Sequence, residues 1–116
     1  MTYRELNVFV ESLGLPTAYY QFTDSTATAP PFVCWFFTDS QDFYADDTNY
    51  QLIRPVRLEL YTDFKDFALE IQIETALSAA GLTYDRSEGA IEAERMYMVS
   101  YDFSVTITLE GENENA

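Results

Sequence analysis

Histidine is absent from this chain of 116 residues, and cysteine occurs once, at Cys34. An intramolecular disulfide is therefore excluded, and a metal site built from several thiolates or imidazoles cannot form. Cys34 lies inside the apolar run Pro31–Phe37, where a cysteine behaves as a small buried residue rather than as a reactive thiol. The sequence also lacks a Gly-rich phosphate loop, a nucleophile elbow and zinc-ligand spacing. We therefore expect no cofactor and no bound metal.

Positive charge is also scarce, because 6 Lys and Arg residues stand against 20 Asp and Glu residues, giving a net charge of −14. So few cations cannot release the counterions of a phosphate backbone, and anionic lipid would repel the chain. No segment approaches the roughly 20 apolar residues of a membrane span, and no basic region followed by an apolar stretch indicates a signal peptide. The acidity fits simple solubility, a cationic partner, or a surface that DNA passes without adhering.

Hydrophobic residues make up 47% of the chain and aromatic residues 16%. A chain of this length forms one ordinary domain with one core. We expect that domain over residues 1–109, followed by a disordered acidic tail over 110–116 that has no apolar anchor. Part of the aromatic content should lie on the surface, where Tyr and Trp suit protein interfaces, and a core packed with Phe and Tyr accounts for the rest.

Apolar spacing of the helical kind predicts helices over 2–13 and 63–80. Thr2 and Glu5 resemble a capping box at the start of the first helix. Asp63 and Asp66 favour the N-terminus of the second helix, and Gly81 is its natural stop.

Strands are predicted over 18–23, 32–38, 50–61, 82–86 and 99–109, and loops over 24–30, 39–49 and 87–93. The segment 32–38 is apolar on both faces, which favours a central strand covered on each side. Pro55 removes one ladder donor, so the first half of 50–61 should lie at an edge or bulge. The order of elements predicts an α+β domain, with a mostly antiparallel four- to five-stranded sheet and two helices packed on one face.

General acid–base catalysis is the one enzyme class that the composition leaves open. Asp66, Glu70 and Glu74 have helical spacing on one face, and Asp63 lies close by. A catalytic pair needs one carboxylate desolvated and the other ionised, whereas acids in a row on a helix more often stay in water. We therefore interpret these residues as a solvated or interface face, and the chain as a protein without enzymatic activity.

Asp46, Asp47 and Asn49 offer oxygen ligands of the kind that a hard cation binds. They lack the Gly and the distal Glu of a calcium loop of the helix–loop–helix type. A turn built by Asp and Asn side chains explains the same residues, and we favour the turn.

Several short segments, spread over nearly the whole chain apart from the acidic tail, occur in a fixed order. They are Leu15–Phe22, Pro30–Val33, Phe43–Tyr50, Glu59–Thr62, then Lys65, Asp66 and Glu70, and finally Glu94–Tyr97. This series resembles the tail terminator proteins of siphophages, also called tail completion or head–tail joining proteins, especially those of phages from Gram-positive hosts.

The resemblance implies a late structural protein of the bacteriophage virion, at the head-proximal end of the tail, made in the host cytoplasm and used in virion assembly. Such a subunit forms a homo-oligomer, a hexameric ring, although the free form can be monomeric. The ring caps the last ring of the major tail tube protein, stops its polymerisation, and meets the head connector or stopper protein. DNA crosses the lumen without specific binding, and no membrane is involved.

A closed ring uses a heterologous interface, so one subunit must carry two different complementary patches. We expect one patch in the polar, aromatic loop around residues 43–50, and a second on the acidic helix face, which would line the lumen or meet arginines of a neighbour. The candidate contact residues are Phe43, Tyr44, Asp46, Asn49, Tyr50, Arg54, Arg57, Asp66, Glu70 and Glu74.

Two other readings of the sequence stay open. Another neck protein, such as a head-completion or connector-stopper subunit, shares the size and the acidity. An acidic DNA mimic that inhibits a host enzyme is compatible with the charge, although its carboxylates should be spaced like phosphates and those of this chain are scattered among aromatic residues.

Overall fold

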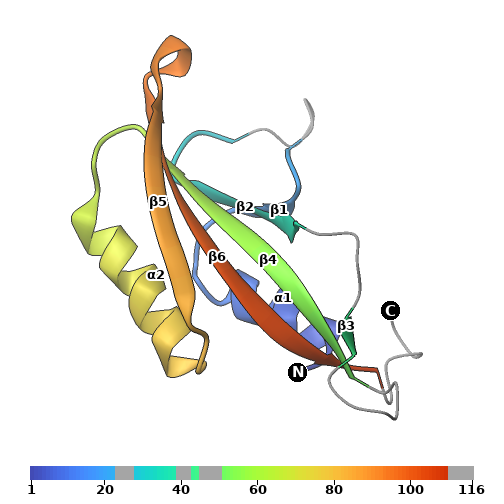
Figure 1. Ribbon diagram of the computed structural model, residues 1–116. Helices are drawn as coiled ribbons and strands as arrows, with labels where there is room; N and C mark the ends of the chain where they lie inside the picture. Colours follow the sequence, from blue (N-terminus) through green and yellow to red (C-terminus); the bar gives the residue numbers. More distant parts are fainter. Residues whose placement is uncertain (23–27, 39–42, 45–50, 110–116) are drawn as a thin grey trace.

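The computed structural model describes residues 1–22, 28–38, 43–44 and 51–109 (Figure 1). These residues form two α-helices and one six-stranded sheet, in the chain order α1 Tyr3–Glu11, β1 Thr17–Tyr19, β2 Phe32–Phe37, β3 Phe43–Tyr44, β4 Gln51–Thr62, α2 Phe67–Ala79, β5 Tyr84–Ile91 and β6 Met96–Thr108. Five strands lie in the order β1-β2-β4-β6-β5, and β3 pairs with β4. β1 and β2 are parallel, and the other pairings among the described strands are antiparallel. The predicted α+β class with a mostly antiparallel sheet is confirmed.

Local side-chain bonds fix where the helices start. Thr2 caps α1: its hydroxyl accepts from the Glu5 amide and the Glu5 carboxylate accepts from the Thr2 amide, so the predicted capping box is confirmed. α2 begins at Phe67 rather than at residue 63, because the Asp66 side chain accepts from the Leu69 amide and is the cap. Gly81, with φ +76°, ends α2 as predicted.

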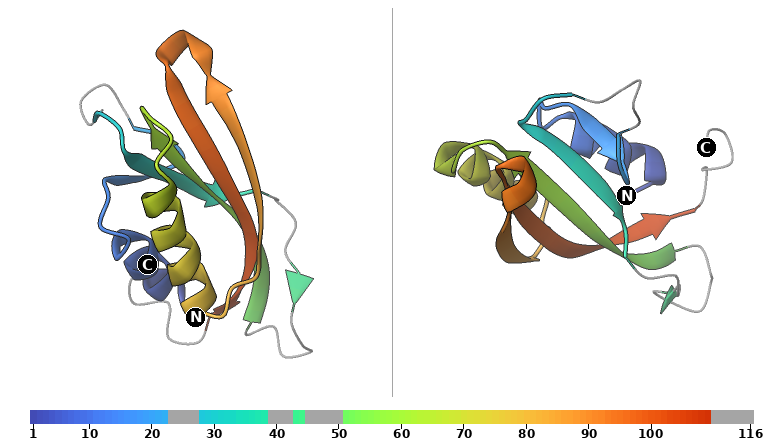
Figure 2. Two further views of the ribbon diagram at one scale, coloured as in Figure 1. Left: turned by 90° about the vertical axis from the view of Figure 1, so that its left-hand side faces the viewer. Right: turned by 90° about the horizontal axis from the view of Figure 1, so that it is seen from above.

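Both helices pack against one face of the sheet, as predicted (Figure 2). Strand alternation sends one set of side chains toward them, and the resulting core joins both helices with the three central strands. Its buried members include Leu6, Val10, Val33, Trp35, Leu58, Leu60, Ile73, Leu77, Val99, Tyr101 and Ile107. In the described part of the chain neither helix is long and apolar enough to cross a membrane.

The expectation that β2 is covered on both sides holds only in part: on the second face Cys34 is buried, whereas Phe32 and Phe36 are half-buried. β2 does lie inside the sheet, between β1 and β4, but the helices of the described chain contribute to a core on one face only. The second apolar set of β2, which includes Phe32 and Phe36, projects to the other face. This face, which we call the open face, positions the candidate site below.

Pro55 lies where a missing amide is tolerated. β2 pairs with β4 only as far as Phe37 opposite Val56, so Pro55 lies one residue past the end of that ladder. Its carbonyl accepts from the Thr38 amide at 3.1 Å, while β6 pairs along its other side. The predicted edge or bulge over this half of the strand is wrong, because β3 pairs with β4 at Leu52 and Ile53 and β6 pairs without a bulge along the other side; only Pro55 itself lies between the two ladders.

The predicted loop over 87–93 is wrong, because β5 continues to Ile91. A turn of 3₁₀ helix, Glu92–Glu94, then reverses the chain with Arg95 in the left-handed region at φ 54°. β5 is an exposed edge strand, so it buries no alternating set of side chains and leaves no period-two pattern. The β5–β6 hairpin projects beyond the rest of the sheet (Figure 1).

Candidate interaction surface

The open face carries an aromatic groove with a volume of about 660 Å³. Its walls come from the segment after β1, from β2 and β4, and from the end of the β5–β6 hairpin. The lining residues are Tyr20, Gln21, Phe22, Phe32, Cys34, Phe36, Glu59, Tyr61, Ile91, Glu94 and Met96. We call this site the aromatic groove.

Ring contacts order the walls of the groove. Tyr20 stacks on Phe36 with 4.9 Å between ring centroids, and Phe32 stacks on Tyr61 at 5.0 Å. Phe22 meets Phe32 edge to face at 5.3 Å. Rings held against one another present a large apolar surface that loses little rotamer entropy when a partner binds.

The backbone places Tyr20 at the rim. Its amide donates to the Trp35 carbonyl at 2.8 Å, which extends the β1–β2 pairing by one step. Its φ of 76° lies in the left-handed region, which costs an L-residue about 1 kcal/mol. This turn directs the ring onto Phe36 and leaves it largely exposed.

Negative charge lies within the apolar lining. The Tyr61 hydroxyl donates to the Glu59 carboxylate at 2.8 Å, and burial together with this bond raises the pKa of Tyr61. Burial and the charge of Glu59 raise the pKa of the Cys34 thiol to about 11. The groove thus combines aromatic walls with the carboxylates of Glu59 and Glu94, which suits a partner with an apolar surface beside a cation.

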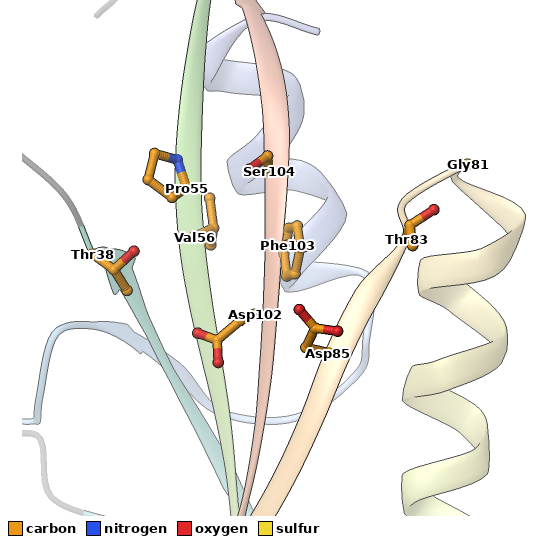
Figure 3. A pocket seen from close by; sticks show the side chains of 9 residues that line it. All are labelled: Thr38, Pro55, Val56, Gly81, Thr83, Asp85, Asp102, Phe103 and Ser104. Atoms are coloured by element: carbon orange, nitrogen blue, oxygen red, sulfur yellow. The ribbon is translucent and has the colours of Figure 1, made fainter. Parts of the chain in front are cut away.

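A second, polar hollow of about 440 Å³ lies farther along the open face (Figure 3). Asp85 of β5 and Asp102 of β6 are direct cross-strand partners there, and Figure 3 shows both carboxylates beside the strands that carry them. Asp102 is held by Arg57 of β4, whose Nε donates to it at 2.8 Å. Among the described residues no group of three or more His, Cys, Asp or Glu side chains is arranged to hold a metal.

The two candidate arginines lie on opposite faces of the sheet. Arg57 is on the open face in its ion pair with Asp102. Arg54 lies on the helix side, with its guanidinium 5.8 Å from the centroid of the Tyr3 ring and 5.7 Å from that of Phe37. They therefore do not form one cationic patch, and a contact of either with a neighbour stays a prediction.

Of the two alternatives for the acidic face of α2, solvated or interface, the solvated one is wrong for Glu70, which is only 4% exposed. Lys65 Nζ and Arg86 Nη2 each donate to Glu70 at 2.6 Å. Arg86 reaches this face because β5 passes beside α2, and its hydrogen bond with Glu70 raises the pKa of the guanidinium. Asp66 is the cap of α2. These carboxylates hold the fold together, and their contact with a neighbour stays a prediction.

Glu74 completes the same network. It accepts from Arg86 Nε at 3.2 Å and from the Tyr101 hydroxyl at 2.8 Å. Lys65 also binds Glu88 of β5 at 2.5 Å, and this bond lowers the pKa of the exposed Glu88 carboxyl. The network fastens the helix to the edge strand.

The candidate loop lies mostly outside the described residues. Phe43 and Tyr44 form β3, paired with Ile53 and Leu52. Asp46, Asn49 and Tyr50, together with Asp47 of the predicted turn, belong to the part of the chain that the structure does not describe. Their role in an interface stays a prediction.

The residues of the aromatic groove are absent from the predicted contact residues. Four segments between residues 20 and 96 build it, so no local pattern marks it. The available signal was the second apolar face of 32–38, which was interpreted as buried, together with an aromatic content too high for the core alone.

No family model matches the chain, and no curated protein matches it. Among solved structures, the fold is similar to that of a chain in the virion of a native gene transfer agent particle. The two chains are 17% identical with a TM-score of 0.51, and the match covers 91% of this chain and 90% of the other. Over nearly its whole length, this α+β domain thus has a fold that a virion protein also has.

Proposed function

We propose that the chain is a structural, non-enzymatic protein of a phage virion, and that its place there is that of the tail terminator. The observation that carries this proposal is the fold similarity to a virion chain, which extends over about nine-tenths of both chains. The ordered series of segments that resembles siphophage tail terminators supports the finer assignment.

In this role, copies of the chain form a ring on the last ring of the major tail tube protein. In the family that the chain resembles, this ring is a hexamer. The ring stops tube growth and offers its other side to the head connector or stopper protein. The net charge of −14 supports this proposal, because DNA would be repelled from the walls of the lumen. The aromatic groove supports an assembly role, because aromatic side chains that line a surface groove are typical of protein contact surfaces.

The test is removal of the gene from the phage that encodes the chain, followed by electron microscopy of the lysate. We expect overlong tails or tails without heads, and restoration of normal tails when the protein is supplied in trans. Tails of normal length on heads that leak DNA would assign the chain to head completion instead. Normal particles would exclude both neck roles.

A second measurement uses purified components. The protein is mixed with tail tubes and viewed by electron microscopy, and we expect added density at one end of the tube. Major tail tube protein should then stop adding to the capped tubes. Continued tube growth in the presence of excess protein would contradict a terminator role.

A further inference from the structure

One side of α2 is apolar and uncovered. Phe64, just before the helix, is 60% exposed, and Phe67 and Ile71 are 65% and 61% exposed. The buried side chains of α2 are Glu70, Ile73 and Leu77, and at 100° per residue Phe67 lies about 60° and Ile71 about 100° from Glu70, the nearest of them. We call Phe64, Phe67 and Ile71 the α2 stripe. Large exposed side chains in such a row mark a contact surface rather than a solvated one.

The α2 stripe and the aromatic groove lie on different faces of the sheet, and the groove runs from the segment after β1 across β2 and β4 to the end of the β5–β6 hairpin. α2 is fastened to β5, one edge of the strand order, through Arg86 and Glu70. Tyr20 and Phe22, which wall the groove, follow β1, the other edge. The stripe belongs to α2, which packs on the helix face (Figure 2), and the groove belongs to the open face. Two different apolar patches on opposite sides of one subunit are what a head-to-tail contact requires.

We propose that the aromatic groove of one copy receives the α2 stripe of the next copy. This inference rests on the proposed ring, for which it names the contact surfaces. The contact would be mainly apolar. Glu59 and Glu94 line the groove, and Lys65 lies beside the stripe, with its Nζ 5.2 Å from the centroid of the Phe67 ring, where Glu70 and Glu88 of its own copy hold it.

The acidic end of the same chain does not suit the groove. Residues 110–116 read Glu-Gly-Glu-Asn-Glu-Asn-Ala, so they offer no large apolar side chain to the aromatic walls. Their three carboxylates would meet those of Glu59 and Glu94, and like charges at such a contact are unfavourable. The exposed apolar side chains of a second copy match the aromatic walls of the groove.

Three matched substitutions test the contact. Ile71→Asp alters the stripe, Tyr20→Asp alters the groove, and Val8→Asp alters an exposed apolar residue of α1 outside both patches. All three positions are more than half exposed, so circular dichroism should show an unchanged fold. By sedimentation velocity of concentrated protein we expect self-association about tenfold weaker or more for the first two, and unchanged for Val8→Asp.

Mixing the two defective variants decides the pairing. The Ile71→Asp protein keeps an intact groove and the Tyr20→Asp protein keeps an intact stripe, so their mixture should form heterodimers that native mass spectrometry detects. If the mixture forms no heterodimer, the proposal is overturned, since a stripe-to-stripe or groove-to-groove contact cannot be restored in this way. An equal loss for Val8→Asp would also overturn it.

Photo-crosslinking tests the same contact in the assembled state. With p-benzoylphenylalanine in place of Phe67, irradiation of the protein, alone and on tail tubes, should join that position to residues 20–36 of another copy. Crosslinks only to the stripe of another copy or to the tube protein, or no crosslink under either condition, would overturn the proposed contact.

The experiments distinguish a failure of the proposed contact from a failure of the proposed terminator role. A ring whose crosslinks lie elsewhere removes this contact and leaves the terminator role standing. Normal tails in the absence of the gene remove the terminator role, while a crosslink from position 67 to the groove in the concentrated protein still supports the contact.

Discussion

Glu70 shows how a single side chain gains a role that its sequence position does not reveal. A buried carboxylate is stable only when cations and donors surround it. Glu70 has two, one from Lys65 five residues earlier and one from Arg86 sixteen residues later. Helical spacing places Glu70 in line with Asp66 and Glu74, but only the path of β5 decides that this line faces protein rather than water.

Substitution of Arg86 by Met should lower the free energy of unfolding by about 2–3 kcal/mol. The change leaves Glu70 buried with one cation, and removal of one partner of a buried pair costs more than the pair contributes; the partial exposure of Arg86 reduces the cost. Urea unfolding followed by circular dichroism measures it. Arg4→Met, at an exposed position of α1, is the control and should change stability by less than about 0.5 kcal/mol. Equal effects of the two substitutions would contradict a stabilising network.

Cys34 should make the fold sensitive to alkaline pH. Its thiol has a pKa of about 11 in the folded protein because of burial and the charge of Glu59, above the ordinary value of 9.0. Between these values the unfolded chain loses the thiol proton and the folded chain keeps it, so the free energy of unfolding falls as pH rises from about 9 to about 11. Below pH 9 this contribution is fully present.

Urea unfolding at several pH values tests this dependence, with Cys34→Ala for comparison. The slope between pH 9 and 11 should be smaller in the variant, whatever its stability at neutral pH. It should not vanish, because burial also raises the pKa of Tyr61 and Tyr101. Identical slopes for the two proteins would show that the thiol does not contribute.

At the scale of elements, sequence periodicity succeeded where one face is buried. α1, the second half of β4, and β6 each bury one regular set of side chains, and each was predicted with small errors at its ends. The strand predicted over 82–86 ends too early, because the residues of β5 from Asp85 to Ala90 are exposed and show no apolar alternation. The strand conformation of β5 comes from its pairing with β6. Hydrogen bonds between two strand backbones leave no mark in the pattern of apolar residues.

The end of α2 offers a test of backbone conformation alone. Gly81 has φ +76°, and a Cβ there would meet no atom within 4 Å, so Gly81→Ala should cost about 1 kcal/mol through the left-handed backbone only. Gly89 in β5 also has open space but no positive φ. Gly89→Ala should therefore be neutral or stabilising by about 0.5 kcal/mol. Thermal and urea unfolding compare them, and equal effects would contradict the assignment of strain to Gly81.

For the whole molecule, the layer arrangement was predictable and the site was not. The order of helices and strands indicated two helices on one face of a mostly antiparallel sheet, and this is the fold observed. A strand with two apolar faces also indicated cover on both sides. Phe32 and Phe36 instead pack with Tyr61 and Tyr20 into an aromatic groove. A sequence shows that a face is apolar, but only the assembled fold shows whether the same chain covers it.

The charge of the whole molecule decides how salt should act on assembly. Each copy carries a net charge of −14, and Arg57, Lys65 and Arg86 are held in ion pairs within the copy. Copies that approach therefore repel one another, and this net repulsion outweighs a single favourable pair such as Lys65 with Glu59. Salt shortens the Debye length from about 10 Å at 0.1 M to about 3 Å at 1 M, and it strengthens rather than weakens apolar contacts when the anion is sulfate.

Self-association should thus become roughly tenfold stronger between about 0.1 M and about 1 M salt. Sedimentation velocity of the wild-type protein over this range measures the effect. The Tyr20→Asp variant is the control, since it should stay dissociated at every concentration of salt if the contact is apolar. Association that weakens with salt would mean that ion pairs hold the copies together, because screening removes attraction between opposite charges as readily as repulsion between like ones.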